Sequence, residues 1–178
     1  MPAIDHLFVS AKTDGADATV VRPSDWNAAH VGLEWYRTTA DLTNSTVTPS
    51  NLTGLAFAIA ASEVVNFILY INSFAAALTT GIAISATGPA SPTAVSITMA
   101  TGMSAGTAVN MLTPPGVAAF ATRVIGLGHS SITLPQITIV HGAIQNGTTA
   151  GTVQLEFSSE IAASLVTVRR GALLLVYR

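Results

Sequence analysis

The residues of this chain whose types could support metal chemistry are few and far apart. The histidines are His6, His30, His129 and His141. No pair has the i, i+4 spacing of a helical metal site, and no carboxylate stands beside them in a recognised ligand pattern. We therefore expect no metal site and no cofactor. One alternative concerns His141, because three copies of it around a threefold axis would share a metal ion or an anion.

The glutamates of the apolar part of the chain fit structural roles better than catalysis. Glu156 falls on the polar face of a predicted strand, and Glu63 and Glu160 flank turns. With the arginines they are candidates for ion pairs between subunits, which specify register more than they stabilise. These arginines are Arg123, Arg169, Arg170 and Arg178. Since "GLGHSS" and "GTTAGT" lack the lysine and the strand–loop–helix context of a phosphate loop, we expect no catalytic residue and no enzyme.

Short apolar runs separated by turn residues make up most of the chain after residue 54. Proline lacks the amide donor of a central strand, so "GPASP" ends one run, and "NGTTAG" is typical of a hairpin loop. The predicted strands cover residues 55–61, 64–71, 80–87, 94–101, 118–127, 136–145, 152–160, 164–170 and 172–178. Eight or nine strands without a long helical period predict an all-β fold, a β-sandwich of the jelly-roll type.

Two of these runs distribute their apolar residues differently. "TVQLEFSSE" alternates, with Val153, Leu155 and Phe157 on one face. "ALLLVYR" is apolar on both faces, and a strand of that kind is covered on both sides. In a single small sandwich the outer face of each sheet meets water, so we expect another subunit to supply the second cover.

The composition favours a permanent assembly. Of the 178 residues 9% are charged, against roughly 25% in an ordinary soluble domain. Because a surface poor in charge associates readily, we expect much of it to be buried between copies. The most apolar window, residues 52–71, is interrupted by Ser62 and Glu63 and predicts no membrane insertion. The net charge of −2, with Arg123 alone between residues 64 and 155, predicts no nucleic-acid binding.

Charge is concentrated at the start of the chain. Residues 1–41 hold six of the nine acidic and three of the seven basic residues. We interpret them as an extended N-terminal arm, followed by a polar linker at 42–53 and the β-sandwich at 54–178. Trp26 and Trp35 would give the arm aromatic anchors for a partner. In the alternative interpretation, the two tryptophans fold back and plug the end of the sandwich.

The stretch "FVSAKTDGADATVVRPSDWNAAHVG", Phe8–Gly32, resembles a segment near the N-terminus of many tailed-bacteriophage virion structural proteins. In those proteins a variant of it precedes a variable β-rich domain. The final strands, "GTVQLEFSSE" to "ALLLVYR", are similar in style to the end of trimeric jelly-roll domains of phage structural proteins. The resemblance implies a capsid-decoration, tail-fibre or tail-tip protein, and it carries over no catalytic residue.

A short arm with one compact β domain, without repeats or heptads for a shaft, suits a cement protein best. The leading hypothesis is a non-enzymatic homotrimer, made in the bacterial host cytoplasm, that decorates the capsid surface of the virion and binds the major capsid protein. The expected contact residues are Arg22, Pro23, Asp25, Trp26, Asn27, Trp35 and Tyr36. One alternative is a tail-fibre or tail-tip component that binds tail or baseplate proteins and a host receptor. The other is a jelly-roll enzyme of the cupin type, which needs several clustered histidines where the strands offer only His141.

Overall fold

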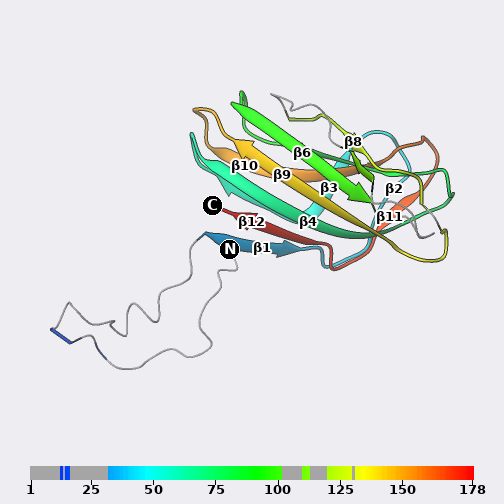
Figure 1. Cartoon of the computed structure of the whole chain (residues 1–178), viewed down its shortest axis with the longest axis horizontal. Helices are drawn as coiled ribbons and strands as arrows, with labels where there is room; N and C mark the ends of the chain where they lie inside the picture. Colours follow the sequence, from blue (N-terminus) through cyan, green and yellow to red (C-terminus); the bar gives the residue numbers. More distant parts are fainter. Residues whose placement is uncertain (1–12, 14, 17–31, 102–109, 113–119, 130) are drawn as a thin grey trace.

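The computed structural model describes residues 13, 15–16, 32–101, 110–112, 120–129 and 131–178. All regular elements in these ranges are strands. They are β1 (Leu33–Arg37), β2 (Leu42–Asn44), β3 (Ser50–Ile59), β4 (Val64–Ala75), β5 (Ile82–Thr87), β6 (Ala94–Thr101), β7 (Asn110–Leu112), β8 (Val124–Ile125), β9 (Gln136–Gln145), β10 (Gly151–Ser159), β11 (Val166–Val168) and β12 (Leu173–Tyr177). They form two antiparallel sheets packed as a sandwich (Figure 1). The predicted all-β sandwich is confirmed, with more strands than the eight or nine expected.

The eight consecutive strands β3 to β10 have the strand order of a jelly roll. One sheet has the order β3-β10-β5-β8, and the other contains β4-β9-β6-β7. Counted along the chain, the first sheet therefore holds the first, eighth, third and sixth of these strands, and the second sheet holds the other four. This is the double-sheet arrangement of two Greek keys. Four further strands, β12, β1, β11 and β2, extend the second sheet beyond β4 and make it eight-stranded.

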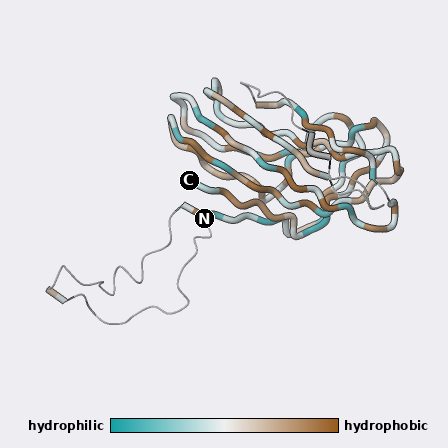
Figure 2. The backbone as a smooth tube through the Cα atoms, in the orientation of Figure 1, coloured by the Kyte–Doolittle hydropathy of each residue, from teal (hydrophilic) through white to brown (hydrophobic). Residues whose placement is uncertain are grey.

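The core lies between the two sheets. Apolar and polar residues alternate along the long strands (Figure 2), and the inward set is fully enclosed. As predicted for the alternating run in β10, Val153, Leu155 and Phe157 are at most 1% exposed. The rings of Phe57 and Phe67 meet from opposite sheets with their centroids 6.1 Å apart. Each fully buried side chain of this size contributes about 1.5–3 kcal/mol through removal from water.

A bulge in β3 brings two closely spaced leucines into this core. The register between β3 and β10 shifts between Gln154 and Glu156. Leu52 and Leu55 are both 0% exposed, although a regular strand would place residues three apart on opposite faces. The amide of Gln154 donates to the carbonyl of Leu52 at 3.1 Å and to that of Leu55 at 3.3 Å. Gly54 supplies the positive φ of 90° that the bulge requires.

The structure corrects the boundaries of the predicted arm and linker. β1 lies within the predicted arm at 1–41, and both β2 and the start of β3 lie within the predicted linker at 42–53. β1 pairs along its whole length with β12, which satisfies backbone groups that a free arm would leave to water. Local composition does not reveal this pairing because the partner strand comes from the other end of the sequence. Residues 1–31 lie outside the described residues, apart from 13, 15 and 16.

Two further expectations about local structure need correction. The "NGTTAG" loop is not a hairpin, because it connects β9 in one sheet to β10 in the other. Asn146 at its start is 2% exposed and donates to the carbonyls of Ala60 and Thr149, which fixes the crossing between the sheets. The strand predicted at 118–127 is reduced to the two residues of β8, while its first two residues lie outside the described residues.

Candidate assembly surface

The outer face of the eight-stranded sheet carries large apolar side chains instead of polar ones. Along β1, β12, β4 and β9 every second side chain points away from the core. The large apolar and aromatic members of this set are Leu33, Trp35, Leu173, Leu175, Tyr177, Val64, Ile68, Tyr70, Phe74, Ile137 and Ile139. We call these residues the apolar outer face. At the outward positions of the same four strands, all of them described, Arg37 is the single residue with a formal charge.

The register of the sheet brings these side chains into rows that cross the strands. Trp35 on β1 lies opposite Leu175 on β12, which lies opposite Ile68 on β4. Ile68 in turn lies opposite His141 on β9. Directly opposed residues of antiparallel strands have Cβ atoms about 4.5–5.5 Å apart. The row is therefore a continuous apolar strip that ends at a histidine.

A second row runs beside the first. Leu173, Tyr70 and Ile139 are register partners on β12, β4 and β9. Tyr70 is 39% exposed and Ile137, two residues before Ile139, is 58% exposed. Leu173 is half-buried by such lateral neighbours, and the described residues form two sheets with no third layer over this face. The outward side chains of β12, predicted to need a second cover, therefore lack one within the described part of the chain.

The outer face of the four-stranded sheet is different in character. Gln154 fills the bulge of β3 with its amide, as described above, and Glu156 accepts a hydrogen bond from the hydroxyl of Ser85 at 3.2 Å. Thr87 and Thr152 are exposed on the same side. This face is more polar than that of the other sheet, although Ala83, Ser85 and Ser158 at its outward positions are buried. The eight-stranded sheet therefore has the more apolar outer face of the two sheets.

Arginines border the apolar outer face at two points. The guanidinium carbon of Arg37 lies 6.0 Å from the ring centroid of Trp35, and that of Arg169 lies 5.5 Å from the centroid of Phe74. Both distances are within the range of cation–π attraction. Aromatic residues and arginine are enriched at protein–protein interfaces. These two arginine–aromatic pairs therefore suit a protein partner as well as the apolar rows of the face do.

A shallow groove of about 300 Å³ crosses this face beside His141. Asn66, Ser96, Thr98 and Tyr177 contribute to its walls. The described residues contain no group of three or more histidine, aspartate and glutamate side chains able to hold a metal ion. Within one chain His141 therefore stands as a single imidazole, and its sharing between three copies stays a prediction.

His129 has a structural role inside the sandwich. It is 1% exposed. Its Nδ1 lies 2.9 Å from the carbonyl oxygen of Thr80, and its Nε2 lies 3.0 Å from the hydroxyl of Ser73. A neutral imidazole that donates from Nδ1 and accepts at Nε2 satisfies both contacts. Local composition does not indicate this burial, because "GLGHSS" is typical of an exposed loop.

Arg178 ties three elements together at the end of the sandwich where β1 begins. Its Nε donates to Glu34 Oε1 at 3.0 Å, a second nitrogen pairs with Glu63, and a third donates to the carbonyl of Ala58. Partial burial would raise the pKa of Glu63, but the hydrogen bond from the Ala60 amide and the charge of Arg178 outweigh it and lower that pKa. Burial likewise acts to lower the pKa of Arg178, and its two glutamate partners outweigh burial and raise it.

These contacts change the interpretation of the charged residues. Glu63 and Arg178 pair within one chain, and Arg169 pairs with Asp41 of the same chain at 3.0 Å. Glu160 accepts from the backbone amide of Gly81 at 2.9 Å. Glu63, Arg169 and Arg178 therefore each have an ionic partner within their own chain, and ion pairs between subunits stay a prediction.

The predicted contact residues fall into three groups. Arg22, Pro23, Asp25, Trp26 and Asn27 lie outside the described residues. Trp35 is on the apolar outer face, where it can meet a partner. Tyr36 points to the other side of β1, packs against the core and donates its phenolic hydrogen to Glu34 Oε2 at 2.5 Å.

The part of the apolar outer face contributed by β4 and β9, notably Ile68, Tyr70 and Ile139, was not predicted from the sequence. A signal was present in "VVNFILYI", where large residues occupy outward as well as inward positions. The described part of the chain contains no helix long and apolar enough to cross a membrane.

Comparisons with known proteins add little to this geometry. No protein-family model matches the sequence, and no curated protein matches it. Among solved structures, the chain is similar to an infectious bursal disease virus Gx strain structure at 14% identity and a TM-score of 0.25, covering 94% of this chain and 40% of that one. It is also similar to the VP2 subviral particle of infectious bursal disease virus at 11% identity and a TM-score of 0.21, covering 93% and 44%. The chain thus spans less than half of these neighbours, and the fold assignment stands on its own strand order.

Proposed function

We propose that this chain is a non-enzymatic structural component of a bacteriophage virion that works as a homotrimer on the capsid surface. In this proposal it is a decoration protein. Its sandwiches associate through the apolar outer face, and its N-terminal segment contacts the major capsid protein. The support for the virus-specific part is the resemblance of Phe8–Gly32 to virion proteins of tailed phages. The support for self-association is the apolar outer face itself.

The apolar outer face is the observation that carries the proposal. A specific interface buries about 800 Å² on each partner, and a monomeric protein rarely exposes a contiguous apolar patch of more than a few hundred Å². A sheet face with two rows of large apolar side chains and one formal charge therefore favours association with another molecule in water. A decoration protein that coats a shell in many copies uses this property, because weak contacts repeated over the shell add up through avidity.

The oligomeric state tests the proposal. Sedimentation velocity of the full chain, from about 1 to 100 µM, is expected to give a trimer across the range. Ile137→Lys and Tyr70→Lys place a charge at exposed positions of the apolar outer face and should weaken the trimer at least tenfold. Thr152→Lys, at an exposed position of the polar sheet, is the matched control and should leave the trimer unchanged. A full chain that stays monomeric at the highest concentration would contradict the proposal.

The place on the virion needs a separate measurement. Quantitative mass spectrometry of purified virions gives the number of copies per particle. Hundreds of copies are expected for a shell decoration, and binding of the purified protein to undecorated shells should follow. A handful of copies would instead support the alternative, a tail-fibre or tail-tip component that binds a host receptor.

A further inference from the structure

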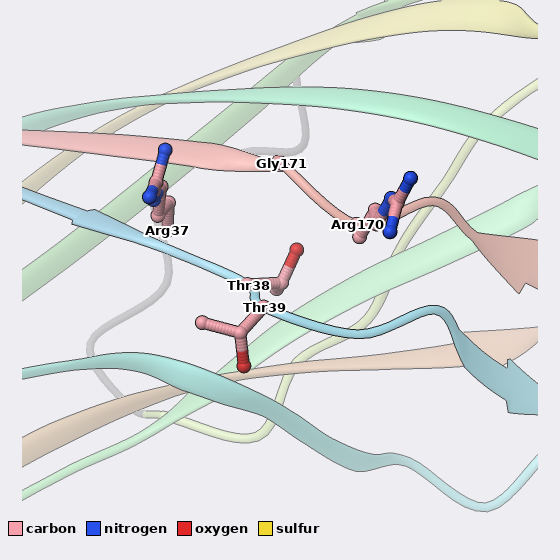
Figure 3. Close-up of a pocket in the computed structure, with 5 residues that line it drawn as sticks. All are labelled: Arg37, Thr38, Thr39, Arg170 and Gly171. Atoms are coloured by element: carbon pink, nitrogen blue, oxygen red, sulfur yellow. The ribbon is translucent and has the colours of Figure 1, made fainter.

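A pocket with a basic rim lies where β1 ends and the turn between β11 and β12 passes it. The cavity measures about 350 Å³ and is lined by Arg37, Thr38, Thr39, Arg170 and Gly171. Figure 3 shows the side chains of Arg37 and Arg170 on either side of Gly171. The pocket borders the apolar outer face, because Arg37 is the outward residue that stacks on Trp35.

The backbone around this pocket is held rigidly. The amide of Thr38 donates to the carbonyl of Ala172 at 3.0 Å, and the amide of Gly171 donates to the carbonyl of Thr38 at 2.9 Å. The hydroxyl of Thr38 accepts from the amide of Ala172 at 3.1 Å. Gly171 has a φ of +90°, which suits the tight turn that carries Arg170. The two arginines therefore project from fixed positions.

The positive charge at this pocket is not balanced by its surroundings. Asp41 is the acidic residue of this region, and Arg169 and the backbone amide of Arg170 occupy its two oxygens at 3.0 and 2.8 Å. Neither Arg37 nor the Arg170 guanidinium has an ion pair with any residue that the structure describes. Two arginine forks beside the Thr39 hydroxyl form a site for carboxylates, which the planar guanidinium binds with two parallel hydrogen bonds.

The N-terminal segment of the chain supplies the complementary charge. From residue 32 onward five acidic and five basic residues balance, so the net charge of −2 comes from residues 1–31. That segment contains two aspartates three residues apart, Asp14 and Asp17, in "TDGADAT". Asp17 precedes Gly32 by 15 residues, which span up to about 50 Å when extended. This length is sufficient to reach an adjacent molecule.

The position of Gly32 favours a neighbour over the segment's own pocket. Gly32 accepts a hydrogen bond from the amide of Arg178 at 2.9 Å, which holds it at the start of β1. Arg37 is at the other end of that strand. The chain therefore enters the sheet at the end remote from its own pocket, and the segment would reach that pocket only by folding back along β1.

We propose that Asp14 and Asp17 of one copy bind in the Arg37–Arg170 pocket of a second copy. This exchange of N-terminal segments rests on the proposed self-association and adds ion pairs between subunits to it. It links the subunits through the segment as well as through the apolar outer face. These ion pairs weaken as the salt concentration rises, because they lie near the surface.

Cysteine cross-linking tests the exchange, since the chain has no cysteine of its own. Ala16→Cys, between the two aspartates, and Thr39→Cys, at the pocket, are introduced into separate full-length chains. After the two variants are mixed and oxidised, a disulfide-linked dimer of one chain of each kind is expected. Thr152→Cys on the polar sheet, paired with Ala16→Cys, is the control and should give no such dimer. Adding Arg37→Gln and Arg170→Gln to the Thr39→Cys chain should slow cross-linking at least tenfold.

The outcomes separate this inference from the proposed function. A protein that is a trimer by sedimentation but forms no disulfide between the Ala16→Cys and Thr39→Cys chains would overturn the exchange and leave self-association standing. In a third variant that carries both Ala16→Cys and Thr39→Cys, a disulfide that forms only within one chain would overturn it in the same way. A monomeric protein would overturn both proposals. Cross-linking that is unchanged by the two arginine substitutions would show that the pocket does not recognise the segment.

Discussion

Phe67 on β4 packs its ring directly over Gly142, its register partner on β9. A Cβ atom at position 142 would collide with that ring. The core between the sheets thus depends on the absence of a side chain at one position, and β9 can carry glycine there because it is paired on both sides by β4 and β6.

This relationship predicts a measurable coupling. Gly142→Ala should destabilise the fold by about 1–3 kcal/mol, because the ring must move from a close-packed site. Phe67→Leu should cost about 1–2 kcal/mol through lost burial. The double variant should lose less than the sum of the two, since the smaller leucine leaves room for the new methyl group. Denaturant unfolding of the four proteins gives the coupling, and strict additivity would refute the contact.

The sequence was sufficient for the strands whose alternation and terminal turns are marked locally. The bounds predicted at 94–101 and 136–145 are those of β6 and β9, because alternation is clear there and turn residues stand at the ends. The apolarity of "ALLLVYR" on both sides likewise predicted that a second subunit covers its outer face. Leu173 and Leu175 lie half-buried on that face, and the covering subunit stays a prediction.

The sequence was not sufficient where pairing over a long distance decides the structure. "LEWYR" holds two charged residues and looked like part of an arm, yet β12 recruits it as an edge strand through five register pairs. The ion cluster of Arg178 and the burial of His129 have the same origin, because each depends on segments far apart in the chain. Only the β12 part of the apolar outer face was predicted from the sequence. Its rows arise from the register between strands, which the order of residues along the chain does not reveal.

Tyr36 predicts a loss of stability at alkaline pH. Burial, followed by its hydrogen bond to Glu34, raises its pKa to about 12, from about 10 in an unfolded chain. A group with a raised folded-state pKa contributes stability that is complete below pH 10 and is lost between about pH 10 and 12. Because Tyr36 is only partly buried, solvent screening reduces the corresponding free energy to roughly 1 kcal/mol. Denaturant unfolding at several pH values should show this loss in the natural chain and in the Tyr70→Phe control, but not in Tyr36→Phe.

Glu63 predicts a change at the acidic end. Its lowered pKa means that its stabilising contribution is present above the unfolded value of about 4.5 and is lost as pH falls through the folded value. The Ala60 amide and the Arg178 guanidinium both lower this pKa. Arg178→Gln removes the second of these causes, so stability should fall at pH 7 by about 1–3 kcal/mol and vary less between pH 5 and 3 than in the natural chain. An unchanged acid dependence in Arg178→Gln would assign the shift to the Ala60 amide alone.

Two truncations test the corrected boundary of the arm. Removal of residues 1–31 leaves β1 intact and should leave the unfolding temperature of the sandwich nearly unchanged. Removal of residues 1–40 takes away β1, leaves one edge of β12 unpaired and deprives Arg178 of Glu34. The longer truncation should therefore cost about 2–4 kcal/mol, or roughly 5–10 °C in melting temperature for a chain of this size. Equal stability of the two truncated proteins would mean that residues 33–37 add nothing to the sheet and belong functionally to the arm after all.

The shorter truncation is also the variant with which shell binding by the N-terminal segment should be measured, because it alone keeps the fold whole. A stable sandwich that no longer binds shells would place the binding in residues 1–31.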